Sequence, residues 1–456
     1  MSKTLPFLLL ALCAAAPASA DSLDDALRAE MKRSHIPGVA IAVVKDGKII
    51  REQGYGLANV EHNVKVTPDT IFQSGSVGKT FTAALVLLLA EDGKLSLDDP
   101  ISRHLANTPK AWEGITIRHL LNHTSGLGDP YAKMDFTRNY SEEELIALES
   151  EIPTLFAPGE KWSYSNMGYH LLGFICNKAG GKFYGDQLRE RIFAPLGMGT
   201  RVISESDIIP HRASGYERKQ GKLVNQSWVA PKLNTTADGS LYLTARDLAK
   251  WDIALYGDKI LNDRVRAASW APGKLNDGSS THYGYGWQVA PRNGHRMIAH
   301  GGAWQGFRAQ LSRFVDDKLT VVVLANSATA RADKLADIVA AHYNPTLAQV
   351  VAKPIEETEP AVAERVRTMF AQIADGKLPG GLSEKAASRL SPEFLAMVSA
   401  DLRDWGALRR VEPLSRTTDG EQRQYKYRLT YASGAMQVEL ALGKGDMVET
   451  LRLRPD

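Results

Sequence analysis

Cysteine is scarce in this chain, which contains only Cys13 and Cys176 among its 456 residues. Cys13 lies within MSKTLPFLLLALCAAAPASA, where Lys3, an apolar stretch and a terminal Ala-Ser-Ala site predict a secretory signal peptide over residues 1–20. Cleavage there would leave Cys176 alone, so no intramolecular disulfide could form and stability would depend on the core. Leu12 stands where a lipoprotein signal requires a small residue, so we expect a periplasmic or secreted protein without a lipid on Cys13.

The chain also lacks a second long apolar segment and an excess of one charge. After residue 20, no stretch is apolar for about 20 residues, which argues against a further transmembrane anchor. Lys and Arg number 55 against 52 Asp and Glu, without a basic block, so the sequence offers no electrostatic footprint for nucleic acid. With 44% hydrophobic residues the chain is globular, and its length predicts two or three domains.

Strand-like segments occur near both ends of the first 345 residues. Residues 38–56 form two β-rich runs around Asp46-Gly47, a pattern typical of a hairpin. Further strands are predicted much later in the chain, at 296–300, 307–314 and 319–326. Between the two groups the pattern favours helices, at 76–91, 115–122, 141–150 and 167–179. We therefore expect a helix-rich lobe, about 71–284, inserted into a sheet formed by about 21–70 and 285–345.

A change of composition separates the last part of the chain. Residues 344–360, NPTLAQVVAKPIEETEP, contain three prolines and an acidic cluster and predict a linker over 346–360. Beyond it we expect an accessory α+β domain, residues 361–456, because two amphipathic helical stretches precede four alternating runs. The helices are predicted at 361–375 and 391–405, and the strands of an antiparallel meander at 408–417, 423–432, 435–442 and 447–454. Three tyrosines on one strand face are predicted to lie in the core: Tyr425, Tyr427 and Tyr431.

The first candidate for chemistry is the segment Ser76-Val77-Gly78-Lys79, which opens the most hydrophobic predicted helix. Ser76 and Lys79 are three residues apart and would share one helix face. At a helix start, unpaired N–H groups favour a developing oxyanion, and burial disfavours the ammonium form of a lysine. A neutral Lys79 amine could then take the proton of Ser76. The structural alternative is a helix-capping serine and a lysine that reaches solvent.

Two further motifs are weak when taken singly. Tyr164-Ser165-Asn166 follows a Pro-Gly turn and precedes a helix, so Tyr164 could relay a proton and Asn166 could bind a substrate amide; a packed tyrosine and a helix cap are the alternative. His300-Gly301-Gly302 ends a strand, where glycines allow close approach of a ligand or form a turn. His119 and His123 lie one helical turn apart without a third ligand, so no metal site is predicted.

Together and in this order, the motifs resemble the serine β-lactamase and penicillin-binding-protein superfamily. The branch most similar contains class C β-lactamases, D-alanyl-D-alanine carboxypeptidases, D-aminopeptidases and esterases. The resemblance covers about residues 24–345 and is reinforced by the phrases HTSGL, FAPGEKWSYSN, DGSLYLTARDLAKW and YGYGW. It implies an α/β (α+β) serine β-lactamase-like fold, with a mostly antiparallel sheet, flanking helices and an inserted helical lobe. It also implies a hydrolase without metal or cofactor, acting on a small-molecule or short-peptide substrate.

The same resemblance implies roles for the motif residues. Ser76 would be the acylated nucleophile, and Lys79 and Tyr164 would carry its proton; which of these two acts first stays open. The backbone N–H groups of Ser76 and Ala303 would form the oxyanion hole. The substrate side of the cleft would comprise Asn166, His300, Gly301, Gly302 and Ala303.

One departure from the family pattern bears on the substrate. Lactamases of this branch usually carry Lys-Thr-Gly where this chain has His300-Gly301-Gly302, so a cation and a hydroxyl that help to hold the lactam carboxylate are missing. We therefore favour a D-amino-acid peptide or an ester as substrate. A true class C-type β-lactamase and a non-catalytic penicillin- or peptide-binding module are the alternatives. The accessory domain, similar in pattern to a nuclear-transport-factor-type cone, is expected to act as a scaffold.

Overall fold

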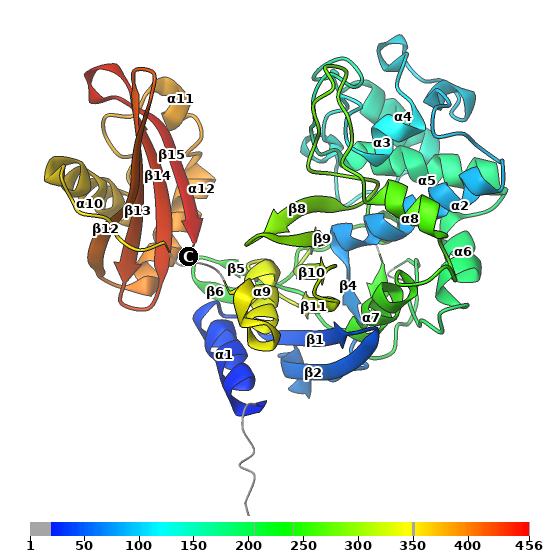
Figure 1. The fold of residues 1–456 in the computed structure, drawn as a ribbon, viewed down its shortest axis with the longest axis horizontal. Helices are drawn as coiled ribbons and strands as arrows, with labels where there is room; N and C mark the ends of the chain where they lie inside the picture. Colours follow the sequence, from blue (N-terminus) through cyan, green and yellow to red (C-terminus); the bar gives the residue numbers. More distant parts are fainter. Residues whose placement is uncertain (1–19, 205, 240, 349–351, 456) are drawn as a thin grey trace, which may run out of the picture.

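The computed structural model describes residues 20–204, 206–239, 241–348 and 352–455 (Figure 1). The predicted signal peptide falls on residues that lie outside this description, apart from Ala20. Among the described residues, no helix combines the length and the apolar character that a membrane crossing needs.

A seven-stranded antiparallel sheet joins the two ends of the larger part of the chain, in the order β3-β2-β1-β11-β10-β9-β8. β1 (Gly38–Lys45) and β11 (Leu319–Ala325) are neighbours, with Val39 opposite Ala325. The early and late strands predicted from the sequence therefore lie side by side. The remaining strands are β2 (Lys48–Asn59), β3 (Val64–Lys65), β8 (Gln288–Arg292), β9 (His295–Trp304) and β10 (Phe307–Phe314).

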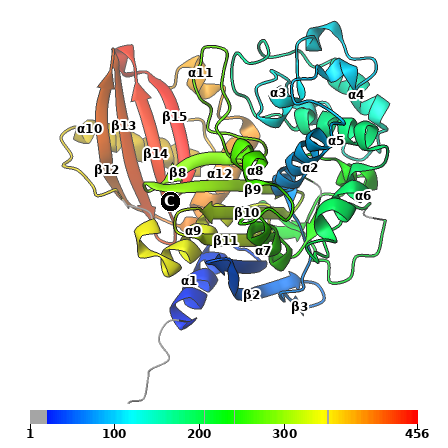
Figure 2. The same ribbon diagram turned by 45° about the vertical axis from the view of Figure 1, so that its right-hand side comes forward.

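Both faces of this sheet are covered. α1 (Ala20–Arg33) and α9 (Ala332–Tyr343) pack together on one face, as both ribbon views show (Figures 1 and 2). α7 (Ala245–Ala254) and the helical lobe cover the other face. Successive strand residues point to opposite sides. In β1, Val39, Ile41 and Val43 accordingly face α1 and α9, whereas Ala40, Ala42 and Val44 join the core of the lobe.

The helical lobe is inserted between β3 and β8. Its helices are α2 (Lys79–Glu91), α3 (Ile117–Leu121), α4 (Glu142–Ser150), α5 (Asn166–Gly180), α6 (Tyr184–Leu188), α7 and α8 (Asp263–Ser269). Two small strand pairs accompany them, namely β4 (Phe72–Gln73) with β7 (Tyr242–Leu243) and β5 (Tyr216–Lys219) with β6 (Lys222–Asn225). α5 passes through the centre of the lobe and is almost wholly buried over its first eleven residues, from Asn166 to Cys176.

The last hundred residues form a second body with its own hydrophobic core. α10 (Pro360–Ala374), the short α11 (Glu384–Ala387) and α12 (Pro392–Trp405) precede a four-stranded antiparallel sheet in the order β12-β13-β14-β15. The strands are β12 (Leu408–Asp419), β13 (Gln422–Tyr431), β14 (Ala435–Leu442) and β15 (Val448–Pro455). Tyr425, Tyr427 and Tyr431 are buried in this core, as predicted. The large antiparallel sheet with flanking helices and the separate C-terminal sheet confirm the predicted fold class.

Candidate active site

Ser76 lies where the sheet meets the helical lobe. It is carried by a 3-10 turn, η1 (Gly75–Gly78), which connects β4 to α2. The helix predicted over 76–91 thus begins at Lys79 instead, and Ser76 is on the turn that precedes it. Gly75, which opens this turn, has a φ of +48°, a left-handed value that glycine adopts readily.

The turn that carries Ser76 is pressed against β9. A Cβ on Gly75 would collide with the backbone of Ala303, and a Cβ on Gly302 would collide with the carbonyl oxygen of Ser74. Only glycine lets two backbones approach so closely. Ser76 and Ala303, whose N–H groups are predicted to form the oxyanion hole, therefore lie on segments whose backbones are in contact. Ala303 is exposed and Ser76 is half-buried.

Lys79 is fully buried, with 0% of its side chain exposed, so its amine does not reach solvent. The amine Nζ lies 3.1 Å from Ser76 Oγ and donates to Asn166 Oδ1 at 2.8 Å. A third hydrogen bond runs to the main-chain carbonyl of Asp238. The two acceptors on Asn166 and Asp238 therefore hold the amine against the Ser76 hydroxyl, and the structural alternative of a solvent-reaching lysine does not apply.

Tyr164 and Asn166 approach Lys79 from the segment that opens α5. The ring centroid of Tyr164 lies 5.0 Å from Lys79 Nζ, and its phenol oxygen is buried with no hydrogen-bond partner among the described residues. Asn166 uses its amide on two neighbours, since Nδ2 donates to Asp129 at 3.1 Å while Oδ1 accepts from Lys79. The helix cap is Ser165, whose hydroxyl accepts from the N–H of Gly168.

His300 is buried, with 2% of its surface exposed. Its Nδ1 lies 2.6 Å from the carbonyl of Gly301, so Nδ1 is the donor and Nε2 accepts from the Tyr283 hydroxyl at 2.7 Å. Burial, followed by the nearby charge of Lys79, lowers the pKa of His300 to about 3. The ring therefore stays neutral and cannot replace the cation of the Lys-Thr-Gly pattern.

Of the other residues around Lys79, Tyr169 and Asp238 were given no role from the sequence, and His123 was considered only as a metal ligand. The ring of Tyr169 lies 5.3 Å from Nζ, and Asp238 supplies the third acceptor. The imidazole of His123 packs 4.2 Å from the ring of Tyr164, and its Nδ1 accepts from the N–H of Ser165. Asp238 lies in the phrase DGSLYL and His123 in the phrase HTSGL. These family phrases could have pointed to both residues, but they do not predict which side chains come into contact.

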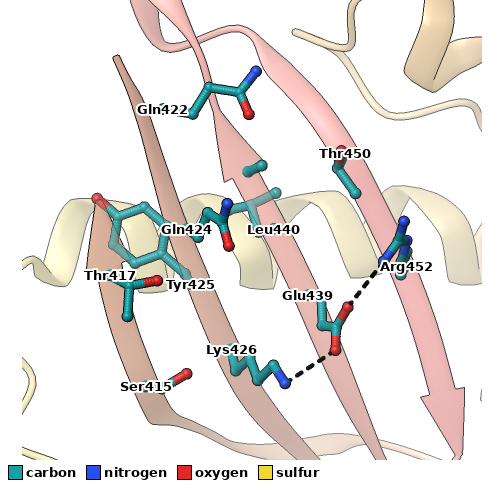
Figure 3. Close-up of a pocket in the computed structure, with 11 residues that line it drawn as sticks. Ser415, Thr417, Gln422, Gln424, Tyr425, Lys426, Glu439, Leu440, Thr450 and Arg452 are labelled. Carbon is teal, nitrogen blue, oxygen red and sulfur yellow. Dashed lines mark ion pairs between the residues drawn. The ribbon is translucent and has the colours of Figure 1, made fainter. Parts of the chain in front are cut away.

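A second concave surface lies on the outer face of the C-terminal sheet (Figure 3). The hollow has a volume of about 300 Å³ and its lining is mostly polar. Glu439 at its floor forms ion pairs with Lys426 at 3.1 Å and Arg452 at 3.7 Å. The three charged side chains are thus engaged with one another and leave a net positive charge, and Ser76 with its buried lysine is the better candidate for catalysis.

A family model described as Beta-lactamase matches residues 23–344. Among curated proteins, the chain is 32% identical over 306 residues to penicillin-binding protein 4* of Bacillus subtilis (strain 168), covering 63% of this chain and 67% of the relative. It is 28% identical over 416 residues to a D-aminopeptidase of Gluconobacter oxydans (strain 621H), covering 88% of this chain and 76% of the relative.

A similar solved structure is that of the D-amino acid amidase from Ochrobactrum anthropi SV3 in complex with L-phenylalanine amide. The TM-score is 0.62 and the identity 26%, over 71% of this chain and 99% of the amidase. Together with the family match, these similarities confirm the resemblance that the motifs predicted.

Proposed function

The chain belongs to the Beta-lactamase family and is a serine hydrolase of that family, and on this premise we propose that it cleaves short D-amino-acid peptides, amides or esters through an acyl-enzyme on Ser76. The observation that carries the proposal is the contact between the buried Lys79 amine and the Ser76 hydroxyl, 3.1 Å apart. A hydroxyl beside an amine that is removed from water is suited to nucleophilic catalysis.

The reaction begins when Ser76 Oγ attacks the substrate carbonyl carbon and its proton passes to Lys79 or Tyr164. A bond forms between Oγ and carbon, and the backbone N–H groups of Ser76 and Ala303 stabilise the negative charge on the carbonyl oxygen. The bond to the leaving amine or alcohol then breaks, and the leaving group takes the proton. A water molecule attacks the acyl-enzyme in the same way, which releases the acid and restores the Ser76 hydroxyl.

The choice of a D-amino-acid substrate over a β-lactam has two supports. His300 is buried and neutral, so its position offers no cation to a lactam carboxylate. The similar proteins also include one named D-aminopeptidase and one named D-amino acid amidase.

Covalent labelling tests the nucleophile. A fluorophosphonate probe should label the wild-type protein, and Ser76→Ala should abolish labelling while leaving the thermal transition unchanged within a few degrees. Ser415→Ala, which removes a hydroxyl from the hollow on the C-terminal sheet, is the matched control and should label normally. Labelling that persists in Ser76→Ala would contradict the proposal, and a folded wild type that is never labelled would favour a binding module.

A small substrate panel tests the acyl donor. We expect turnover of D-amino-acid p-nitroanilides or p-nitrophenyl esters, with the L-amino-acid p-nitroanilides as the matched comparison and slow turnover of nitrocefin. Fast hydrolysis of nitrocefin with no turnover of D-amino-acid amides or esters would assign the protein to the lactamases instead.

We also propose that the protein is exported to the periplasm or secreted, from the signal-like residues 1–20. Intact-mass analysis of the protein from a secreting host should give a mature chain that starts near Asp21. A mass that retains residues 1–20, or that carries a lipid on Cys13, would contradict this assignment.

A further inference from the structure

Behind Lys79, a line of buried ionisable side chains leads away from the cleft. The main-chain carbonyl of Asp238 accepts from Lys79, and its carboxylate accepts from the Tyr131 hydroxyl. The other carboxylate oxygen lies 3.3 Å from Nε2 of His170 on α5, and Nδ1 of the same ring lies 2.7 Å from Glu149 on α4. Glu149, His170 and Asp238 are 0%, 1% and 5% exposed, so solvent hardly screens their charges.

The two carboxylates hold His170 as an imidazolium. Burial alone would lower the pKa of His170, but the charge of Asp238 and the bonds to Asp238 and Glu149 outweigh burial and raise the pKa to about 10. Burial would likewise raise the pKa of Asp238, but His170 and Lys79 hold it well below its ordinary value. At neutral pH the Asp238 carboxylate therefore has the His170 cation on one side and the Lys79 amine on the other.

The remaining titratable groups around Lys79 do not balance that carboxylate. Tyr164 and Tyr169 present their rings to Nζ. Burial, followed by the charge of Lys79, lowers the pKa of both His123 and His300, which keeps the two imidazoles uncharged. Asp129 is linked to the amine through the side chain of Asn166 and adds a negative charge, not a positive one.

The surroundings of His170 likewise contain few other charges. Tyr131 packs on its ring at a centroid distance of 6.3 Å, and burial raises the pKa of Tyr131 and of Tyr184 on α6 well above the ordinary value. Glu142 and Lys232, of opposite sign, line a small cavity beside the ring. The imidazolium is thus the cation that faces Asp238 from the side opposite to Lys79.

We propose that His170 is a positioning residue for Lys79 and acts through Asp238. The imidazolium fixes the Asp238 carboxylate, and with it the carbonyl that receives the Lys79 amine. Its positive charge also offsets the negative charge that the Asp238 carboxylate places near the Lys79 amine. This inference rests on the proposed role of Lys79 in the acylation of Ser76.

The test is the pH dependence of kcat/KM on a chromogenic ester or D-amino-acid p-nitroanilide that the wild type hydrolyses. His170→Gln removes the positive charge and should move the acidic limb of the profile to higher pH by about one unit. Asp238→Asn removes the negative charge but keeps the carbonyl, and should move the same limb to lower pH by about one unit. The double variant should return the limb close to its wild-type position, and KM on the pH plateau should change less than kcat.

Two further variants separate charge from packing. His170→Lys keeps a positive charge and should leave the acidic limb where the wild type has it. Asp247→Asn removes a carboxylate that is 4% exposed and bonded to Thr200, so it controls for the loss of a buried charge elsewhere and should not move the limb. If His170→Gln does not fold, the inference is tested by the position of the acidic limb in Asp238→Asn and His170→Lys.

The outcomes distinguish this inference from the proposed function. Suppose that both variants still label at Ser76. The inference is then overturned if the acidic limb of the kcat/KM profile stays in place in His170→Gln and Asp238→Asn, or if it moves in the same direction in both. A wild type that lacks Ser76-dependent labelling overturns the proposed function, and the inference with it.

Discussion

Replacing Gly302 by alanine should disable the enzyme without unfolding it. The new Cβ would lie about 1 Å or more inside normal contact distance of the Ser74 carbonyl oxygen, which is backbone and cannot rotate away. β9 and the turn that carries Ser76 would have to separate by a similar amount. A displacement of about 1 Å in a catalytic site can cost about 10²-fold in rate, and the loss of one oxyanion donor costs about 10²–10³-fold. We therefore expect kcat/KM to fall about 100-fold or more.

Gly301→Ala is the matched control for this prediction, one residue away on the same strand. Its Cβ would meet nothing closer than the side-chain Oε1 of Gln310 at 3.2 Å, and that flexible group can move. We expect its loss of kcat/KM to be at least about tenfold smaller than that of Gly302→Ala, with both variants melting within a few degrees of wild type. Equal losses in the two variants, or a Gly302→Ala enzyme of normal activity, would refute the argument that close backbone contact builds the site.

Three further predictions concern stability and pH. Tyr164→Phe should lower kcat about 10²-fold without lowering the melting temperature, because the deleted hydroxyl is buried and unpaired among the described residues; a destabilised variant would show an unrecognised partner. Asp252→Ala should cost about 3–5 kcal/mol in urea unfolding, because it leaves the buried Arg313 without its carboxylate; a loss below 1 kcal/mol would contradict this. The folded protein binds the His170 proton more tightly than the ordinary pKa of 6.5, so its contribution to stability is complete below that pH and disappears as pH rises toward 10. The melting temperature of His170→Gln should accordingly depend less on pH over that interval than that of the wild type.

The sequence predicted those parts of the site that are close together in the chain. Ser76 and Lys79 lie within one turn, and Tyr164 and Asn166 within one short segment, so residue spacing together with the family pattern was sufficient. It also predicted that β1 would pair with late strands, because two buried runs without local partners need each other. The predicted start of α2 was wrong by three residues, because Ser76, Val77 and Gly78 belong to a 3-10 turn packed against β9, a distant strand that the local pattern does not reveal.

The network behind Lys79 could not be predicted for a similar reason. His170 looks like an ordinary residue of a hydrophobic helix, Glu149 ends another helix, and Asp238 stands in a loop almost 70 residues after His170. Only the packing of α4 and α5 against that loop brings the three together. The contacts with Asp238 and Glu149, which give His170 its charge, are likewise a property of the folded lobe and not of the sequence around it.

The position of β11 between β1 and β10 has a consequence for how the chain is made. Until Leu319–Ala325 has been synthesised, β1 and β2 form only an isolated hairpin, which is marginal in water. The sheet must then close across almost the whole length of the larger body, a topology that folds slowly. A truncated chain that stops before Leu319 should leave two apolar strand edges open, and we expect it to aggregate instead of folding in part.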